Sequence, residues 1–155
     1  MLNQDNLKTI REIVQEFFKM MTIEAQAEIS LQEGETVFIA IESPEPQILI
    51  GENGQTLMEI QQILKTILRR KIPEQFYIDV DVNGYRQAKN DYLRKMAQSL
   101  ADEVALSGQE KYLPPMPAYE RRIVHTELSK RTDVVSESRG EEPERRIIIK
   151  IASPK

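Results

Sequence analysis

The chain has 155 residues, of which 40% are hydrophobic and 30% are charged, and it carries a formal net charge of −4. This length is enough for one or two small units that each bury a core. No stretch approaches the roughly 20 apolar residues of a membrane helix, and the first residues lack the features of a secretory signal. We therefore expect a cytoplasmic protein with no membrane insertion.

The chain contains no cysteine and a single histidine, His125. Without cysteine, disulfides, thiolate metal sites and cysteine nucleophiles are excluded. One histidine leaves a single candidate base for hydrolysis, and neither a paired carboxylate cluster nor a metal-ligand spacing accompanies it. We expect no metal, no cofactor and no enzymatic activity.

Charge is distributed unevenly along the chain. Residues 1–82 hold 7 Lys and Arg against 14 Asp and Glu, a net charge of −7, whereas residues 83–155 hold 14 against 11, a net charge of +3. Two halves of opposite sign favour two units with different tasks. If the chain binds a polyanion, we expect the second half to dominate, because Lys and Arg neutralise phosphates.

The first half alternates between helical and strand patterns. Apolar side chains at steps of three and four from Leu7 to Met21 predict an amphipathic helix with Asp5 as its N-cap. Apolar runs on both sides of Glu33-Gly34 predict a hairpin. The elements expected after it are a short helical turn at residues 47–50, a glycine turn at 51–54, a helix over 57–71 and a strand over 76–82.

The second half begins with a long helix, predicted over residues 85–106. Pro117 suits the first residue of a short helix over residues 118–129. Two strands are expected near the end, at 134–135 and 145–152, joined by a polar turn over 138–143. The predicted fold class is α+β, with a first unit at residues 1–83 and a second, small α/β sandwich-like unit at 84–155 that includes the connecting helix.

A glycine-bracketed turn, Gly51-Glu52-Asn53-Gly54, opens the helix that follows it. Glycine allows unusual backbone torsions and close approach, and the N–H groups at a helix N-terminus suit phosphate oxygens. A nucleic-acid backbone lies against such a loop in modules whose GxxG clamps about four nucleotides. The alternative is an ordinary turn at the entry to a helix.

In its α-β-β-α-α-β order, the segment Asn6–Val82 resembles a type II K-homology (KH) domain. The resemblance implies that Gly51, Glu52, Asn53 and Gly54 contact nucleic acid. Many such loops carry a basic residue between the glycines, whereas Glu52 places a carboxylate there. This departure leaves open a second role, in which the acidic half is a protein-interaction surface.

Arg121 and His125 lie four residues apart on the short predicted helix. At this spacing the guanidinium and the imidazole project from one face, about one turn apart. The pair suits a phosphate, because Arg donates bidentate, charge-assisted hydrogen bonds and His adds a further donor. The alternative is a half-buried His at the edge of the core and an Arg in an ion pair with a carboxylate.

The residues that follow this pair extend the pattern. A Ser-x-Ser-x-Gly turn at residues 136–140, then Glu142-Pro143 and then Arg145-Arg146 come after the helix. In this order residues 90–152 closely resemble the small domain that is named for its Arg-x-x-x-His signature. A KH unit followed directly by this domain resembles the bacterial Jag family, the SpoIIIJ-associated proteins. Many members of that family carry a further N-terminal domain, for which we expect no counterpart in this sequence.

The resemblance implies that one set of side chains in the second unit contacts nucleic acid: Arg121, His125, Arg122, Ser136, Ser138, Arg145 and Arg146. Alternation along a strand sends Arg145 and Arg146 to opposite faces. One of these two arginines is therefore expected to be a structural ion-pair partner.

The resemblance also implies a function. The expected protein is a non-enzymatic binder of single-stranded nucleic acid, RNA first and single-stranded DNA second. It would act in post-transcriptional control linked to cell envelope growth, division or sporulation, with a small KH protein as a further partner. The alternative, from a different class, is a protein-interaction adaptor whose acidic KH half docks a partner protein.

Overall fold

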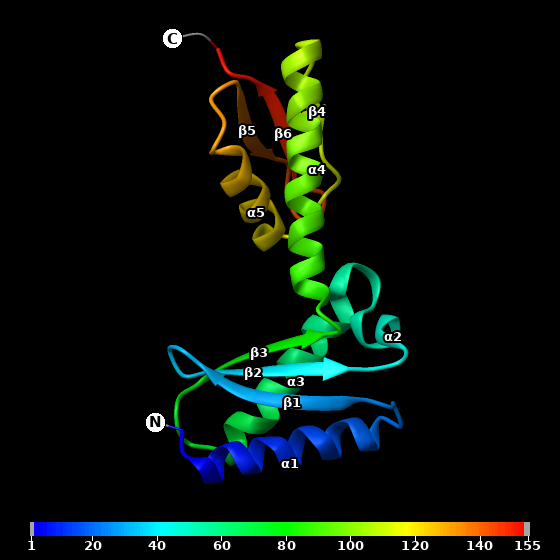
Figure 1. Cartoon of the computed structure of the whole chain (residues 1–155), viewed down its shortest axis with the longest axis vertical. Helices are drawn as coiled ribbons and strands as arrows, with labels where there is room; N and C mark the ends of the chain where they lie inside the picture. The colour runs from blue at the N-terminus through cyan, green and yellow to red at the C-terminus, as the bar shows by residue number, and fades with distance from the viewer. Residues whose placement is uncertain (1, 154–155) are drawn as a thin grey trace. The chain divides into compact units, whose positions relative to one another are not determined.

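The chain divides into two compact units, Met1–Arg86 and Gln87–Lys155, each built around its own three-stranded sheet. A computed structural model describes residues 2–153 of these units. Helices and strands alternate in both units (Figure 1), so the α+β class predicted from the sequence is confirmed.

The first unit follows the order expected from the sequence. Its elements are α1 (Gln4–Met20), β1 (Gln26–Gln32), β2 (Thr36–Glu42), α2 (Pro46–Ile50), the short 3-10 helix η1 (Glu52–Gly54), α3 (Gln55–Lys71) and β3 (Tyr77–Val82). The sheet order is β1-β2-β3, in which β1 is antiparallel and β3 parallel to the central strand β2.

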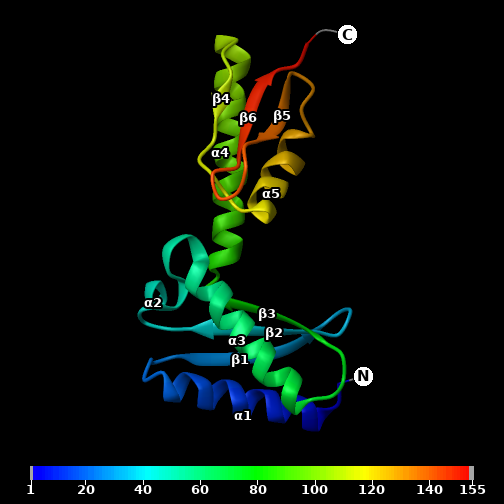
Figure 2. The ribbon, with the colours of Figure 1, turned by 180° about the vertical axis from the view of Figure 1, so that it is seen from behind.

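The core of the first unit lies between its two long helices and one face of the sheet. α1 buries Ile10, Val14 and Phe18, which recur at steps of four and so share one side of the helix. α3, which lies in front of the sheet in Figure 2, buries residues at steps of three and four. Alternate residues of β2 and β3 complete this core: Val37, Ile39, Ile41, Ile78, Val80 and Val82.

α1 begins before the first apolar residue of its stripe. The Asn3 side chain accepts a hydrogen bond from the Asn6 backbone N–H at 2.8 Å, and the Asn6 side chain accepts one from the Asn3 backbone N–H at 2.9 Å. This reciprocal capping box makes Asn3 the N-cap. The prediction that Asp5 caps the helix is wrong. Asp5 lies in the first turn, where its negative charge interacts favourably with the helix dipole.

The second unit contains most of α4 (Tyr85–Ser107), followed by β4 (Lys111–Tyr112), α5 (Ala118–Leu128), β5 (Val134–Arg139) and β6 (Arg146–Ile151). Both outer strands are antiparallel to the central strand, in the order β4-β6-β5. α4 lies in front of this sheet in Figure 1 and behind it in Figure 2. The buried side chains of the helices meet those of β6: Leu93, Ala97, Ala101, Val104, Val124, Leu128, Ile147 and Ile149.

β5 is longer than the sequence predicts. Pairing with β6 continues through Ser138, opposite Ile147, to Arg139, opposite Arg146. The prediction of a polar turn that begins at Ser138 is therefore wrong. β5 lies at the edge of the sheet, where polar side chains are tolerated, so the hydrophobic signal of a strand fades after its first two residues. As a result, the two serines of this segment are held on a strand.

Candidate functional site

Arg121 on α5 is buried, with 8% of the residue exposed. Its Nη1 donates a hydrogen bond to the Met116 carbonyl oxygen at 2.6 Å, and its Nη2 pairs with Glu142 Oε1 at 2.7 Å. The structure therefore contains the ion pair with a carboxylate that the sequence left open as an alternative. A contact between Arg121 and nucleic acid stays a prediction.

His125 is half-buried one turn further along α5. Its Nδ1 and Ser136 Oγ share a hydrogen bond of 2.7 Å. Burial lowers the pKa of the imidazole, and the positive charge of Arg121 lowers that pKa further. Because the ordinary pKa of histidine is about 6.5, His125 is uncharged at neutral pH. It then has one N–H donor and one acceptor nitrogen.

A second side chain is held on β5 in the same way. Arg145, directly before β6, donates a hydrogen bond from Nε to Ser138 Oγ at 2.9 Å. Ser136 and Ser138 point to the same face of β5, because side chains alternate along a strand. We call the four half-buried residues His125, Ser136, Ser138 and Arg145 the α5–β5 strip. In this strip two serine hydroxyls hold an imidazole and a guanidinium next to each other.

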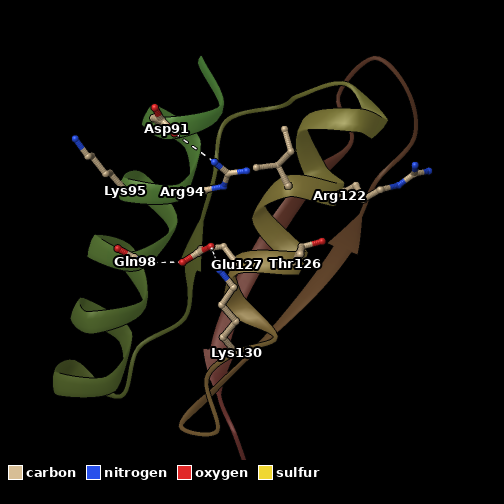
Figure 3. A pocket seen from close by; sticks show the side chains of 9 residues that line it. Asp91, Arg94, Lys95, Gln98, Arg122, Thr126, Glu127 and Lys130 are labelled. Carbon is tan, nitrogen blue, oxygen red and sulfur yellow. Dashed lines mark hydrogen bonds and ion pairs between the residues drawn. The ribbon is translucent and has the colours of Figure 1, made fainter. Parts of the chain in front are cut away.

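The other two arginines predicted for the site lie elsewhere. Arg146 faces the opposite side of the sheet from Ser138, as alternation predicts, and its Nη2 lies 3.5 Å from Glu144 Oε2. Arg146 is thus one member of a structural ion pair, while Arg145 belongs to the strip. Arg122 is exposed on α5 and points away from α4 (Figure 3). The structure therefore brings together four of the seven predicted residues and places Arg121 beneath them through Glu142 and Met116.

A groove of about 650 Å³ lies between α4 and α5 (Figure 3). Its lining residues from α4 are Asp91, Arg94, Lys95 and Gln98, and those from α5 and the following turn are Arg122, Ile123, Thr126, Glu127 and Lys130. Sequence reasoning identified only Arg122 among them. The spacing of the α4 residues places them on one helix face, but the sequence pattern alone does not say which element that face meets.

The glycine turn of the first unit is held in the backbone conformation that its glycines permit. Gly51 has φ 71° and ψ −174°, and a Cβ there would lie 2.1 Å from Thr56 Oγ1. Gly54 has φ 80° and precedes the first residue of α3. Glu52 and Asn53, between the glycines, are exposed. The turn presents backbone to solvent together with one carboxylate side chain.

Two kinds of site are absent from residues 2–153, the part of the chain that the structure describes. No group of three or more His, Asp or Glu side chains there is arranged to hold a metal ion. No helix there is both long and apolar enough to cross a membrane.

The α5–β5 strip and the α4–α5 groove both fall within one continuous stretch of the chain. Residues 91–150 match the family model of the Arg-x-x-x-His domain, the small domain that the second half of the sequence resembles. This match covers every residue of the strip and of the groove, and it covers none of the first unit.

Relatives that share the name "RNA-binding protein KhpB" match longer stretches. The protein of Clostridium symbiosum is 29% identical over 141 residues, which are 90% of this chain and 64% of the relative. The protein of Bacillus subtilis strain 168 is 31% identical over 130 residues, 82% of this chain and 62% of the relative. The protein of Lactiplantibacillus plantarum is 31% identical over 104 residues, 67% of this chain and 32% of the relative. This chain thus spans between 32% and 64% of the length of these relatives. Together with the domain match, they support the resemblance to the Jag family.

Proposed function

We propose that the chain is a member of the Jag family that binds single-stranded RNA through the α5–β5 strip. The observation that carries this proposal is the pair of hydrogen bonds that fixes His125 to Ser136 and Arg145 to Ser138, within the matched residues 91–150. A binding role is also favoured over a catalytic one, because His125 has no carboxylate partner among residues 2–153 that would make it a general base. The name shared by the relatives supports RNA as the ligand.

The strip offers donors that suit a nucleic-acid backbone. Arg145 uses Nε on Ser138, so its two terminal nitrogens remain for a phosphate, which they can bind bidentately. With Nδ1 engaged by Ser136, His125 offers its Nε2 side to the same strand. Hydroxyl groups such as those of Ser136 and Ser138 can hydrogen-bond a 2′-hydroxyl, which favours RNA over single-stranded DNA.

Arg121 takes part through an exchange of anions. Its guanidinium pairs with Glu142, whose side chain is 58% exposed on the loop between β5 and β6. A phosphate that approaches the strip replaces this carboxylate on the guanidinium, because both are anions that accept hydrogen bonds in the same fork geometry. The Met116 carbonyl keeps Arg121 in position during the exchange.

The test is a titration of labelled single-stranded RNA with the full chain and with the double variant His125→Ala/Arg145→Ala. Hydrogen bonds to charged groups contribute about 1.5–3 kcal/mol, so the variant should lose at least about tenfold in affinity. Arg11→Ala, which removes one exposed cation from α1, is the control for the change in net charge. Full affinity of the double variant would contradict the assignment of the strip. A parallel titration with DNA of the same sequence checks the preference for RNA.

The first unit is proposed to be a type II KH domain with an auxiliary clamp. The order of its elements and the positive φ of Gly51 and Gly54 support this assignment. Glu52 opposes phosphate binding at the same turn, because a like charge lies where the phosphate would approach. Backbone N–H groups and Asn53 are the groups that remain for RNA.

A second candidate function, protein-interaction adaptor, is favoured by the net charge of −7 on residues 1–82. In that role the acidic unit docks a partner protein, and a small KH protein is the partner that the family resemblance suggests. Crosslinking in cells separates the two roles. Recovery of RNA joined to residues 87–155 supports the first function, whereas recovery of only a protein joined to residues 2–86 supports the second.

The regulatory role proposed for the chain is post-transcriptional control linked to cell envelope growth, division or sporulation. This part of the proposal rests on the family resemblance. Sequencing of the crosslinked RNA tests it, because transcripts unrelated to these processes would contradict it.

A further inference from the structure

The α4–α5 groove carries more positive charge than its own residues neutralise. Four cationic side chains line it (Arg94, Lys95, Arg122 and Lys130), against the two carboxylates of Asp91 and Glu127. All the lining residues belong to the second unit and to the matched residues 91–150. The groove is therefore a part of this unit with a net positive charge, separate from the α5–β5 strip.

Both carboxylates of the groove already have partners. Glu127 is buried and accepts hydrogen bonds from Gln98 Nε2 at 2.5 Å and from Lys130 Nζ at 2.6 Å. These two bonds lower the pKa of Glu127, so it stays ionised and compensated. Asp91 accepts a hydrogen bond from Arg94 Nη1 at 3.2 Å. The carboxylates thus compensate Lys130 and Arg94.

Two cations remain available to a ligand. Lys95 and Arg122 are exposed, and neither has a hydrogen-bond or ion-pair partner among residues 2–153. Figure 3 shows the two side chains extending outward from opposite sides of the groove, while Gln98 and Glu127 point toward each other across it. Exposed Thr126 adds a hydroxyl between them. This arrangement places one free positive charge on each rim of the groove.

The groove is continuous with the α5–β5 strip through α5. Arg122 lies three residues before His125 and four before Thr126, so it neighbours both on the helix surface. A strand bound at the strip therefore meets Arg122 next, then Thr126, and then the α4 rim with Lys95. Packed helix axes lie only about 8–10 Å apart, which is a short distance for a nucleic-acid chain.

We propose that the α4–α5 groove is a second binding site for the phosphodiester backbone of the same single-stranded RNA, with Lys95 and Arg122 as its phosphate contacts. This inference rests on the proposed function, because the strand reaches the groove from the α5–β5 strip. The strip holds the strand in place, and the groove extends the bound length across α5 to α4. Contacts of this kind are electrostatic and independent of base identity.

The test compares the full chain with the double variant Lys95→Gln/Arg122→Gln and with the single variant Lys95→Gln. Binding of an RNA of about 12 nucleotides and of one of about 4 is measured between about 50 mM and 200 mM salt. Each lost phosphate contact reduces the slope of log K against log salt by about 0.7 for a single strand. The longer RNA should therefore show a slope reduced by about 1.4 with the double variant and about 0.7 with the single variant.

Two further variants sharpen the comparison. Lys8→Gln/Arg11→Gln removes the same two charge types from the exposed side of α1 and should leave the slope unchanged. Thr126→Glu places a carboxylate inside the groove at an exposed helical position and should weaken binding of the longer RNA several-fold. Melting curves of each variant check that the fold is retained, which is expected because all the substituted side chains are exposed.

The outcomes separate the groove from the strip. An unchanged slope with Lys95→Gln/Arg122→Gln, while the full chain binds RNA, overturns the groove and leaves the proposed function standing. An equal loss with Lys8→Gln/Arg11→Gln also overturns it, because the effect is then one of total charge. Failure of the full chain to bind either RNA overturns both proposals.

Discussion

The two units place their candidate sites on different kinds of group. In the first unit the site is a stretch of backbone, opened by Gly51 and Gly54, with an acidic side chain beside it. In the second unit the site consists of side chains, since serines hold His125 and Arg145. A backbone site is sensitive to any added Cβ, whereas a side-chain site is sensitive to the loss of partners. Substitutions can therefore test this difference separately in each unit.

The largest expected effect is in the first unit. Gly51→Ala places a Cβ 2.1 Å from Thr56 Oγ1, in a conformation with φ 71° and ψ −174° that is almost exclusive to glycine. We expect a loss of about 3 kcal/mol or more in the free energy of unfolding. The control is Gly34→Ala, at φ 72° with no atom within 4 Å of the new Cβ, which should cost only about 1–2 kcal/mol. Equal losses in urea denaturation would show that Thr56 does not restrict the turn.

The next effect is in the second unit. Arg121→Ala leaves the Met116 carbonyl oxygen without its side-chain donor and Glu142 without its cation. We expect a loss of about 1–3 kcal/mol in the free energy of unfolding. Glu142→Gln, which removes only the exposed partner, should cost less than about 1 kcal/mol. The same variant should raise RNA affinity, since the anion that competes with phosphate is gone. Unchanged affinity would contradict the anion exchange at Arg121.

A smaller effect is expected at the glycine turn. Glu52→Lys replaces an exposed carboxylate with a cation between the two glycines. If the turn clamps RNA, affinity should rise by about 1 kcal/mol or less, which is up to about fivefold. Glu45→Lys, also exposed and outside the turn, is the control for total charge. Equal gains in both variants would show that the turn is not a specific clamp, which favours the adaptor role for this unit.

The smallest effect is a dependence of stability on pH. The pKa of His125 is lower in the folded chain than in the unfolded chain. The unfolded chain therefore binds the proton more readily, and stability is full above about pH 6.5 and falls as the pH drops below that value. The free energy of unfolding should be lower at about pH 5.5 than at about pH 7.5, and His125→Gln should reduce this difference. His125 is the only histidine in the chain, so a difference that persists in the variant would contradict this cause.

Local patterns in the sequence predicted most of the fold. The α1 stripe, the turn at Gly51–Gly54 and the opposite faces of Arg145 and Arg146 all follow from periodicity or glycine chemistry. The errors lie where two segments compete or cooperate. Asp5 and Asn3 are both good N-caps, and only the reciprocal bonds with Asn6 decide between them. The polar end of β5 is a strand because β6 pairs with it, and no local apolar signal marks it.

The sequence by itself determined which residues are available for function: the acidic glycine turn of one half, and the Arg121–His125 pair with its serines and arginines in the other. Only the tertiary structure decided which of them meet. It buries Arg121 against Met116 and Glu142, joins His125 and Arg145 to β5, and opens a positively charged groove between α4 and α5. The physical reason is that hydrogen bonds and ion pairs between distant segments depend on how helices pack on the sheet, which periodicity within one segment does not encode.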